Sequence, residues 1–452
     1  MPSDPRAPTG LNLRTAHSGG SGTGATRTNS SGTGAHPSGP GTAKLPNGGS
    51  KSVNANGSSV ERNRSGKITG VTTAKGATAK MDSHGRASRI HDGKGTTISR
   101  GPHGERKIET TRADHSRLVS NGRHGGYLER RYNRDGHEYV QRAYYVNGRA
   151  YTRVYAPYYY LRFPYYGYIP AYYYAPAFYG WVYNPWPAPV VYAWGWYGAP
   201  WYAPYGYYFA PYPVYPAPAF WLADYALAAS LQAAAEDAES GSLRSEPGFV
   251  YASAPVSPQN QGKGSPLLSS AIKDQIAEEV KQIIADEKDA AGKQGAAAVP
   301  AVPPSLDPRF TLFIVSSELS LDTETGTCSV TAGDIVRRKD FNVDADRTVS
   351  VEVVSSKNDD CAVGAASRLK LDDLEEMHDS LREKVDAGMK SLSENQGKTG
   401  IPTGPAAAPA KVAEGQADPD PTVGDELKKQ QEAADAAEKD VQEATKESGS
   451  AD

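Results

Sequence analysis

Runs of β-forming residues, broken by short polar turns, are clearest between residues 127 and 162. Three such runs are separated there by residues 133–136 and by Asn147-Gly148. Asn-Gly is a favoured two-residue hairpin turn, because both residues tolerate the positive φ that the right-handed strand twist requires. The pattern therefore predicts a three-stranded β-meander over 127–162.

Shorter runs of the same kind over residues 67–126 are punctuated by glycine. These glycines recur every nine or ten residues, at Gly76, Gly85, Gly95 and Gly104. The spacing suits short strand–turn units or a small β-solenoid, and a disordered basic region with chance spacing fits the same residues.

Residues 1–66 consist mainly of Gly, Ser, Thr, Asn and Pro with scattered Arg and Lys. They offer almost nothing to bury, so they cannot offset the roughly 1–2 kcal/mol per residue that ordering a backbone costs. We expect a disordered basic segment here. The first 24 residues also lack the apolar run of roughly 7–15 residues that a secretory signal needs.

Residues 163–223 form an uncharged segment rich in Tyr, Trp and Pro. Twelve prolines interrupt it, so it cannot hold the roughly 20 continuous helical residues of a membrane span, and no transmembrane helix is expected. Proline also denies central strands their amide donors, which leaves turns, edge strands and polyproline II, with rings stacked on one another. The candidate aromatic interaction segment comprises Tyr179, Trp181, Tyr183, Trp186, Trp194, Trp196 and Trp201.

Helical spacing of apolar residues predicts three helices, over 218–239, 266–292 and 372–396. The second has one narrow apolar stripe that must meet a partner, and a coiled coil is one way to supply it. Residues 240–265 are a linker rich in Ser, Gly, Pro and Gln. Residues 397–452 are expected to be an acidic disordered tail, since they have little to bury.

Residues 307–371 contain six short β-rich runs, which predict a small all-β domain with an SH3-like or a PDZ-like topology. The only two cysteines, Cys328 and Cys361, both lie here near expected strand ends. Their placement predicts a single disulfide and excludes a zinc site built on four cysteines.

The net charge of −3 conceals three unlike blocks. Residues 1–162 hold 26 Lys and Arg against 10 Asp and Glu, whereas residues 226–452 hold 23 against 41. Between them, residues 163–225 carry one charge, Asp224. Together with the low-complexity stretches, this composition predicts a mostly disordered chain with one small all-β domain and flanking amphipathic helices.

Candidate catalytic chemistry is sparse. Eight of the nine histidines precede Tyr139, in the part of the chain expected to be least ordered. The exception, His378, follows Glu375 at the spacing that di-iron sites use, but such sites need two copies of the motif and this chain has one. A solvated helix face is the expected environment of both residues. We therefore predict no catalytic residue, no metal ligand and no cofactor, and we do not expect an enzyme.

Two aromatic motifs carry a resemblance. Residues 178–186 read FYGWVYNPW and residues 194–196 read WGW. They resemble a family of uncharacterised bacterial proteins of cell-envelope type, which join a Tyr/Pro/Trp-rich segment to a small two-cysteine β domain. The resemblance covers about residues 130–400. It implies a shared architecture and a cell-envelope, periplasmic or secreted setting, and no catalytic residue.

These observations predict a non-enzymatic structural or interaction protein of the bacterial cell envelope or surface. Its expected partners are further copies of itself or an envelope or matrix polymer. The alternative is a cytoplasmic protein that binds RNA or DNA, because 26 cations over residues 1–162 can neutralise phosphates without fixing a register on bases.

Overall fold

We describe a computed structural model of the chain. It describes residues 41–82, 85–100, 106–121, 125–146, 148–242, 268–292, 302–324, 326–357, 361–413, 415 and 417–449. Gly104, most of the expected 240–265 linker and residues 1–40 lie outside these ranges. All the described residues belong to one compact unit.

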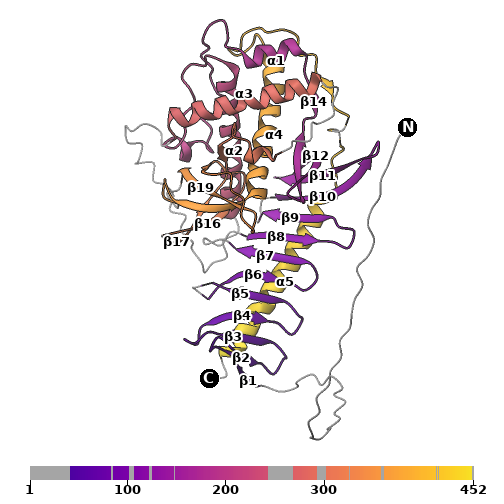
Figure 1. Cartoon of the computed structure of the whole chain (residues 1–452), viewed down its shortest axis with the longest axis vertical. Coiled ribbons are helices and arrows are strands. Elements are labelled where there is room, and N and C mark those ends of the chain that lie inside the picture. The colour runs from indigo at the N-terminus through magenta and orange to yellow at the C-terminus, as the bar shows by residue number, and fades with distance from the viewer. Residues whose placement is uncertain are drawn as a thin grey trace, which may run out of the picture. The chain divides into compact units, whose positions relative to one another are not determined.

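One antiparallel sheet takes up the first part of the described chain, and each of its 13 strands pairs with the next in sequence (Figure 1). The strands are β1 (Thr42–Lys44), β2 (Ser50–Val53), β3 (Ser59–Arg62), β4 (Ile68–Thr72), β5 (Thr78–Met81), β6 (Ala87–His91), β7 (Thr96–Arg100), β8 (Arg106–Thr111), β9 (Arg117–Asn121), β10 (Gly125–Arg134), β11 (His137–Val146), β12 (Arg149–Tyr160) and β13 (Phe163–Ile169).

The glycine spacing is the spacing of the hairpin turns in this sheet. In the turn between β2 and β3, the Gly57 amide donates to the Asn54 carbonyl (3.0 Å) and the Asn54 amide donates to the Ser58 carbonyl (2.7 Å). Gly57 closes this three-residue loop at φ 85°, a left-handed position that glycine occupies without strain. His115 holds the equivalent place at φ 63°. The expectation of disorder was therefore wrong for residues 42–66, which form β1 to β3 and their turns.

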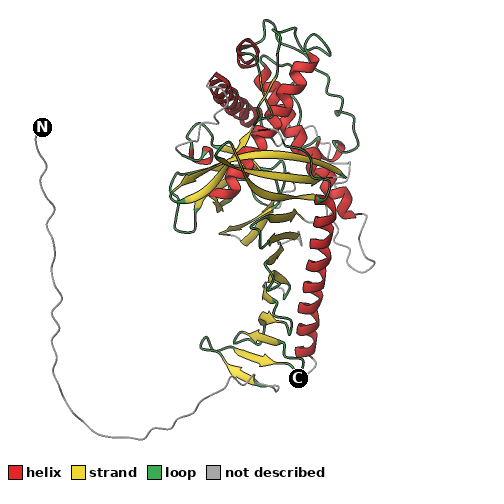
Figure 2. Cartoon of the chain, turned by 90° about the vertical axis from the view of Figure 1, so that its right-hand side faces the viewer, coloured by secondary structure: helices red, strands yellow, loops and turns green. Residues whose placement is uncertain are grey.

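Helix α5 (Val423–Gly449) crosses one face of this sheet and covers its apolar residues (Figure 2). Each of the strands β3 to β8 contributes one buried apolar side chain to the seam, and the residues of α5 that pack on them are mostly alanines. The buried seam comprises Val60, Val71, Ala79, Ile90, Ile98 and Ile108 on the strands and Ala434, Ala437, Val441 and Ala444 on α5. The acidic tail was thus wrongly expected to be disordered, because its burial partner lies more than 300 residues away in sequence.

The Tyr/Pro/Trp-rich segment folds into an aromatic core with four helices and the 3-10 turn η1 (Ala203–Tyr205). The helices are α1 (Pro176–Tyr183), α2 (Pro218–Ser242), α3 (Ser270–Gly292) and α4 (Leu371–Asn395). Gly388 lets α4 approach α2 closely, since a Cβ there would lie 2.5 Å from Leu222 Cδ2. A further pair of strands, β14 (Tyr172–Tyr173) and β21 (Ala410–Lys411), ties the segment that follows α4 to this core.

Most of the rings of the candidate aromatic interaction segment face this core. Tyr179, Trp186 and Trp194 are buried, and Trp194 stacks on Trp221 with ring centroids 4.9 Å apart. Trp181, Trp196 and Trp201 pack against the same core and are partly buried. Tyr183 is the exposed member, at 40%. Self-packing therefore accounts for six of the seven rings.

Asp224, the one charge of the aromatic block, is fully buried and anchors that block to α3. Its carboxylate lies 2.8 Å from Lys273 Nζ, and it accepts hydrogen bonds from the Tyr212 amide (2.6 Å) and the Tyr215 hydroxyl (2.7 Å). Lys273 also lies 3.7 Å from the centre of the Tyr212 ring. Burial raises the pKa of Asp224 and lowers that of Lys273, although each group opposes the shift of the other.

The six runs of the expected β domain are strands, arranged as a four-stranded sheet and a hairpin. The sheet contains β15 (Leu312–Ile314), β18 (Ile335–Arg338), β19 (Thr348–Ser355) and β20 (Ala366–Lys370), and the hairpin contains β16 (Leu319–Thr323) and β17 (Gly326–Val330). A 3-10 turn, η3 (Pro304–Leu306), precedes them. Their core also includes Tyr158 and Tyr165 from the large sheet and Leu374 and Met377 from α4, so it is shared with the rest of the molecule.

Cys328 on β17 and Cys361 after β19 form a disulfide, with Cα atoms 5.2 Å apart. It joins the hairpin to the four-stranded sheet. This architecture shows that the fold class expected from composition was wrong. Across the described ranges the chain is rich in β-structure, with a 13-stranded sheet, smaller sheets and five α-helices. It is not mostly low-complexity or disordered.

Replacing Asp224 with Asn should lower the free energy of unfolding by about 3–5 kcal/mol, because Lys273 would then be a buried cation without a countercharge. Lys273→Met should cost a similar amount, and the double variant less than the two single losses combined. Urea titration measures all three. Lys390→Met, which breaks the exposed Lys390–Glu394 pair, should change stability little. A near-native stability of D224N would contradict the anchoring role.

Reducing the Cys328–Cys361 bond should destabilise the protein by about 3 kcal/mol, because the unfolded chain regains the freedom of the closed loop. Thermal melts with and without reductant measure this, and mass spectrometry of alkylated, unreduced protein should show no modified thiol. Two freely alkylated cysteines would contradict the bond.

Candidate binding cavity

A cavity of about 640 Å³ lies between the large sheet and the helices α2 and α4. Strands β8 to β13 form one wall, and α4 forms the opposite wall with residues between Asp372 and Ala387. Cavities of this volume are typical of sites for small ligands or short polymer segments. The lining combines tyrosine rings with charged side chains of both signs, which makes it unlike the apolar cores around it.

Three tyrosines on adjacent strands form a ladder along the sheet wall. Tyr127 on β10 is directly opposite Tyr144 on β11, which is directly opposite Tyr151 on β12. Directly opposite residues point to the same face of a sheet, and the ring centroids are 5.2 Å and 5.0 Å apart. Tyr144 and Tyr151 are stacked at an interplanar angle of 10°. Among the described contacts, the hydroxyls of Tyr127 and Tyr151 have no hydrogen-bond partner.

Arg142 is the central charge of the sheet wall. Its guanidinium lies 4.5 Å from the centre of the Tyr155 ring and 4.9 Å from that of Tyr127. It also forms ion pairs with Glu129 (2.9 Å) and with Glu376 of α4 (2.6 Å). Burial acts to lower the pKa of Arg142, but Glu376 and the surrounding tyrosines outweigh it and hold the pKa well above its ordinary value. This side chain therefore fixes the sheet against α4.

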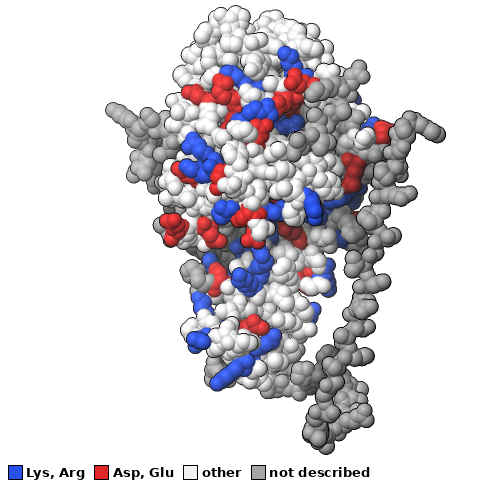
Figure 3. All heavy atoms as spheres, viewed as in Figure 1, with Lys and Arg blue, Asp and Glu red and all other residues white. Residues whose placement is uncertain are grey.

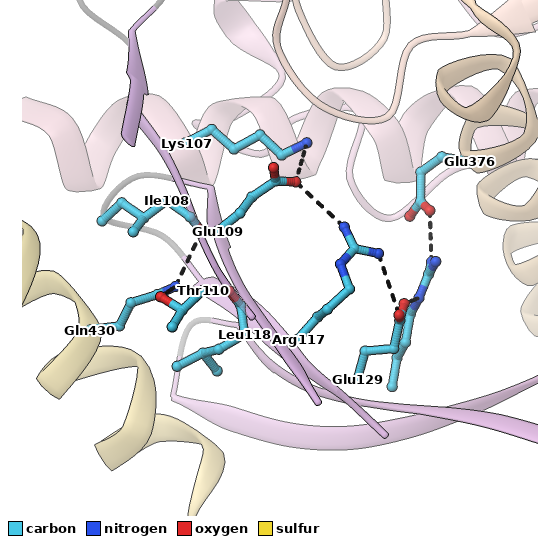
Figure 4. A network of polar contacts seen from close by, with 10 residues as sticks. Lys107, Ile108, Glu109, Thr110, Arg117, Leu118, Glu129, Glu376 and Gln430 are labelled. Carbon is cyan, nitrogen blue, oxygen red and sulfur yellow. Dashed lines mark hydrogen bonds and ion pairs between the residues drawn. The ribbon is translucent and has the colours of Figure 1, made fainter. Parts of the chain in front are cut away.

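The ion pairs continue across neighbouring strands (Figure 4). Glu129 lies 3.3 Å from Arg117, Arg117 lies 3.6 Å from Glu109, and Glu109 lies 3.2 Å from Lys107. The charges alternate in sign from β11 to β8, so neighbouring side chains hold one another in place.

Gln430 of α5 fixes the reverse side of the same strands (Figure 4). Its amide nitrogen donates to the carbonyls of Ile108 (3.3 Å) and Leu118 (2.8 Å) and to the Thr110 hydroxyl (2.9 Å). The strands that carry Lys107, Glu109 and Arg117 are thus held from both faces.

On the α4 wall, three carboxylates are committed to the protein itself. Glu375 accepts from the Tyr158 hydroxyl (2.8 Å) and the Ser305 amide (2.7 Å). Asp379 accepts from the Tyr168 amide (2.9 Å), and Glu383 accepts from the Tyr155 hydroxyl (2.5 Å). Burial raises the pKa of all three carboxyls.

Asp373 is different, because in the part of the chain that the structure describes its carboxylate accepts no hydrogen bond and forms no ion pair. Burial raises the pKa of Asp373, and Lys107 across the cavity and Lys370 act against this shift. Its carboxylate is therefore a polar group that remains available to a ligand in the cavity.

The expected solvated face for Glu375 and His378 was wrong, since both side chains are buried. His378 packs edge-to-face on Phe310 with ring centroids 4.5 Å apart. Burial lowers the pKa of His378 to about 3, which leaves the ring neutral at ordinary pH. This side of α4 is not solvated, because Phe310 of the β domain and Ser305 pack on it. Within the described ranges, no cluster of His, Cys, Asp and Glu side chains could hold a metal ion.

None of the seven rings of the candidate aromatic interaction segment lines the cavity, and neither do Cys328 and Cys361. The three tyrosines of the ladder come from residues 127–162, where the sequence predicted only a meander. Of the other cavity tyrosines, Tyr165 and Tyr166 belong to the predicted aromatic segment and Tyr225 to the predicted helix 218–239. One signal was present: a two-residue turn at 147–148 places residues equally distant from it on facing strands, which pairs Tyr144 with Tyr151. The α4 wall had no such signal.

Comparison with known proteins finds no matching family model, no matching curated protein and no matching solved structure. None of the described helices is both long enough and apolar enough to cross a membrane.

Replacing Arg142 with Lys should destabilise the protein by about 2–3 kcal/mol, because a lysine keeps the charge but loses the flat fork that binds two carboxylates between two rings. Arg142→Met should cost more, since it leaves Glu129 buried and only partly compensated. Urea unfolding measures both, and near-ultraviolet circular dichroism should report the disturbed tyrosines. If R142K matched the native protein in both, Arg142 would not hold the two walls together.

Proposed function

We propose that this chain is a non-enzymatic binding protein of the bacterial cell envelope or surface, and that its cavity between the large sheet and α4 holds a saccharide segment of a matrix polymer. The observation that carries the proposal is the tyrosine ladder facing a wall of carboxylates. The flat C–H face of a sugar ring packs on an aromatic ring, while its hydroxyl groups need charged or polar partners around the edge.

Available polar groups support this ligand class. Tyr127 and Tyr151 present hydroxyls next to their ring faces, and Asp373 presents a carboxylate from the opposite wall. Rigid elements would orient the ligand. On one face of the sheet α5 holds the strands, and on the other face Arg142 ties them to α4.

A binding role suits the carboxylates better than catalysis does. Glu375, Asp379 and Glu383 accept hydrogen bonds from protein groups, so each is committed to holding α4 against its neighbours. The disulfide supports the envelope setting, since such bonds persist mainly in oxidising compartments.

The alternative is a protein that binds nucleic acid through its basic half. Fewer cations are free to bind phosphates there than the sequence suggests. Five cations of the large sheet and its turns pair with carboxylates of residues 420–440. They are Lys75, Arg100, Arg106, Arg112 and Arg130.

Calorimetric titration with neutral oligosaccharides, such as hexamers of glucose and of N-acetylglucosamine, tests the cavity. At least one should bind the native protein without being cleaved, and Tyr151→Ala should weaken that binding about tenfold through loss of ring stacking. Tyr183→Ala, which removes an exposed ring that is not part of the cavity lining, is the matched control and should bind as the native protein does. Absence of binding, or an equal loss in both variants, would overturn the proposal.

A further inference from the structure

Strands β4 to β8 leave one face uncovered by α5. Val71, Ala79, Ile90 and Ile98 point toward α5, so their neighbours along each strand point the other way. We call these outward residues the open face. Together with the neighbours of Ile108 on β8, it comprises Gly70, Thr72, Thr78, Lys80, Arg89, His91, Thr97, Ser99, Lys107 and Glu109.

The strand register arranges the open face in two rows that run across the strands. Hydroxyl and imidazole groups form the first row, in which Thr72 is opposite Thr78, Thr78 is opposite His91 and His91 is opposite Thr97. The His91 Nδ1 and Thr97 Oγ1 atoms lie 2.9 Å apart.

The second row carries the cations. Lys80 is opposite Arg89, Arg89 is opposite Ser99 and Ser99 is opposite Lys107. A chain that crosses the strands would therefore meet a cationic row beside a row of hydroxyl groups.

The two faces of the sheet differ in charge balance. On the covered side, Lys75 lies 2.9 Å from Asp440 and Arg100 lies 2.5 Å from Glu438, both on α5. On the open face, Lys80 and Arg89 are exposed, and within the described residues neither forms an ion pair. Figure 3 shows this side of the lower strands, where most of the charged atoms are those of Lys and Arg.

We propose that the open face binds an extended acidic polysaccharide that lies across the strands and leads into the cavity. The proposal rests on the proposed function in taking a saccharide as the ligand, and it adds the charge and the direction of the chain. Because the whole protein carries a net charge of −3, a polyanion needs a local patch of unpaired cations to bind, and this face provides one.

Three features favour an acidic glycan over a nucleic acid. The cations of the second row pair with carboxylate, sulfate and phosphate groups alike, but the hydroxyls of the first row can exchange hydrogen bonds with the many hydroxyls of a glycan. Neighbouring strands are about 4.8 Å apart, close to the length of one pyranose unit. Residues 67–121 contain no Phe, Tyr or Trp, so bases would not find the row of large aromatic rings on which single strands stack.

The open face and the cavity share residues on β8. Lys107 belongs to the second row and also lines the cavity, together with Glu109 on β8 and Arg117 and Val119 on β9. Glu109 extends the first row, because it is opposite Thr97 on one side and Val119 on the other. A polymer held across β4 to β7 would therefore reach the tyrosine ladder with its next units.

The test uses the full chain and long polygalacturonate as the acidic probe, with hydroxyethyl cellulose as the neutral polymer and poly(dT) as the nucleic acid. The native protein should bind polygalacturonate, more weakly as salt rises. The double variant Lys80→Thr, Arg89→Thr should bind it about tenfold more weakly. Threonine suits an exposed strand, so the melting temperature should change little.

The matched control removes an equal charge from two exposed turns, with Arg64→Thr and Lys94→Thr, and should bind polygalacturonate as the native protein does. Equal losses in both double variants, tighter binding of poly(dT) than of polygalacturonate, or affinity that ignores salt would overturn the open face as a glycan site.

The two proposals fail separately. Tyr151→Ala should abolish most binding of neutral hexamers and leave most of the polygalacturonate affinity, since the open face is intact. If neutral hexamers do not bind but K80T/R89T still weakens polygalacturonate, the cavity proposal is wrong and the open face stands. If the hexamers bind and polygalacturonate does not, the open face is wrong and the cavity stands.

Discussion

The packing of α5 against the large sheet is the contact on which much of the molecule depends. Each of the strands β3 to β8 directs one apolar residue to this face that the sheet cannot bury by itself, and α5 covers the resulting seam from Val60 to Ile108. The helix is acidic and the strands are basic, so pairs such as Arg106–Asp435 (2.5 Å) add to a seam built on the small side chains of α5. Screening by salt should therefore loosen this contact more than the aromatic core.

Buried ion pairs connect the other segments of the molecule. Asp224 and Lys273 link the aromatic block to α3, and Arg142 links the sheet to Glu376 on α4. A buried pair contributes little stability compared with well-packed apolar residues, but a single partner left alone is costly. Each partner of these pairs therefore requires the other to be in place, which couples the segments that they join.

The two faces of the large sheet therefore differ in how far their cations are paired. The side beneath α5 is neutralised within the molecule, whereas Lys80 and Arg89 on the other side remain in solvent. Near β8 and β9 the second side passes under α4 and becomes the wall of the cavity. Because the acidic helix α5 pairs with cations on its own side of the sheet, the unpaired cations lie on the opposite face. That face leads to the tyrosine ladder.

The sequence alone determined the local structure well in several places. The six β-rich runs of 307–371, the glycine spacing of the hairpins and the three apolar helical patterns all correspond to elements of the structure. The reason is that turns, strand runs and amphipathic stripes depend on neighbours within a few residues. The prolines of 163–223 likewise excluded a membrane-spanning helix, because each one limits its own backbone.

Only the tertiary structure decided which segments have something to bury. Residues 42–66 and 423–449 each resemble disordered chain by composition, and they become ordered through contact with elements distant in sequence. His378 and Glu375 lie on a polar helical face that the β domain covers. The cavity also depends on the tertiary structure, because Tyr127, Arg142 and Asp373 come together only when the sheet and α4 pack against each other. Burial is a property of the whole arrangement, and for that reason composition underestimated the order of this chain.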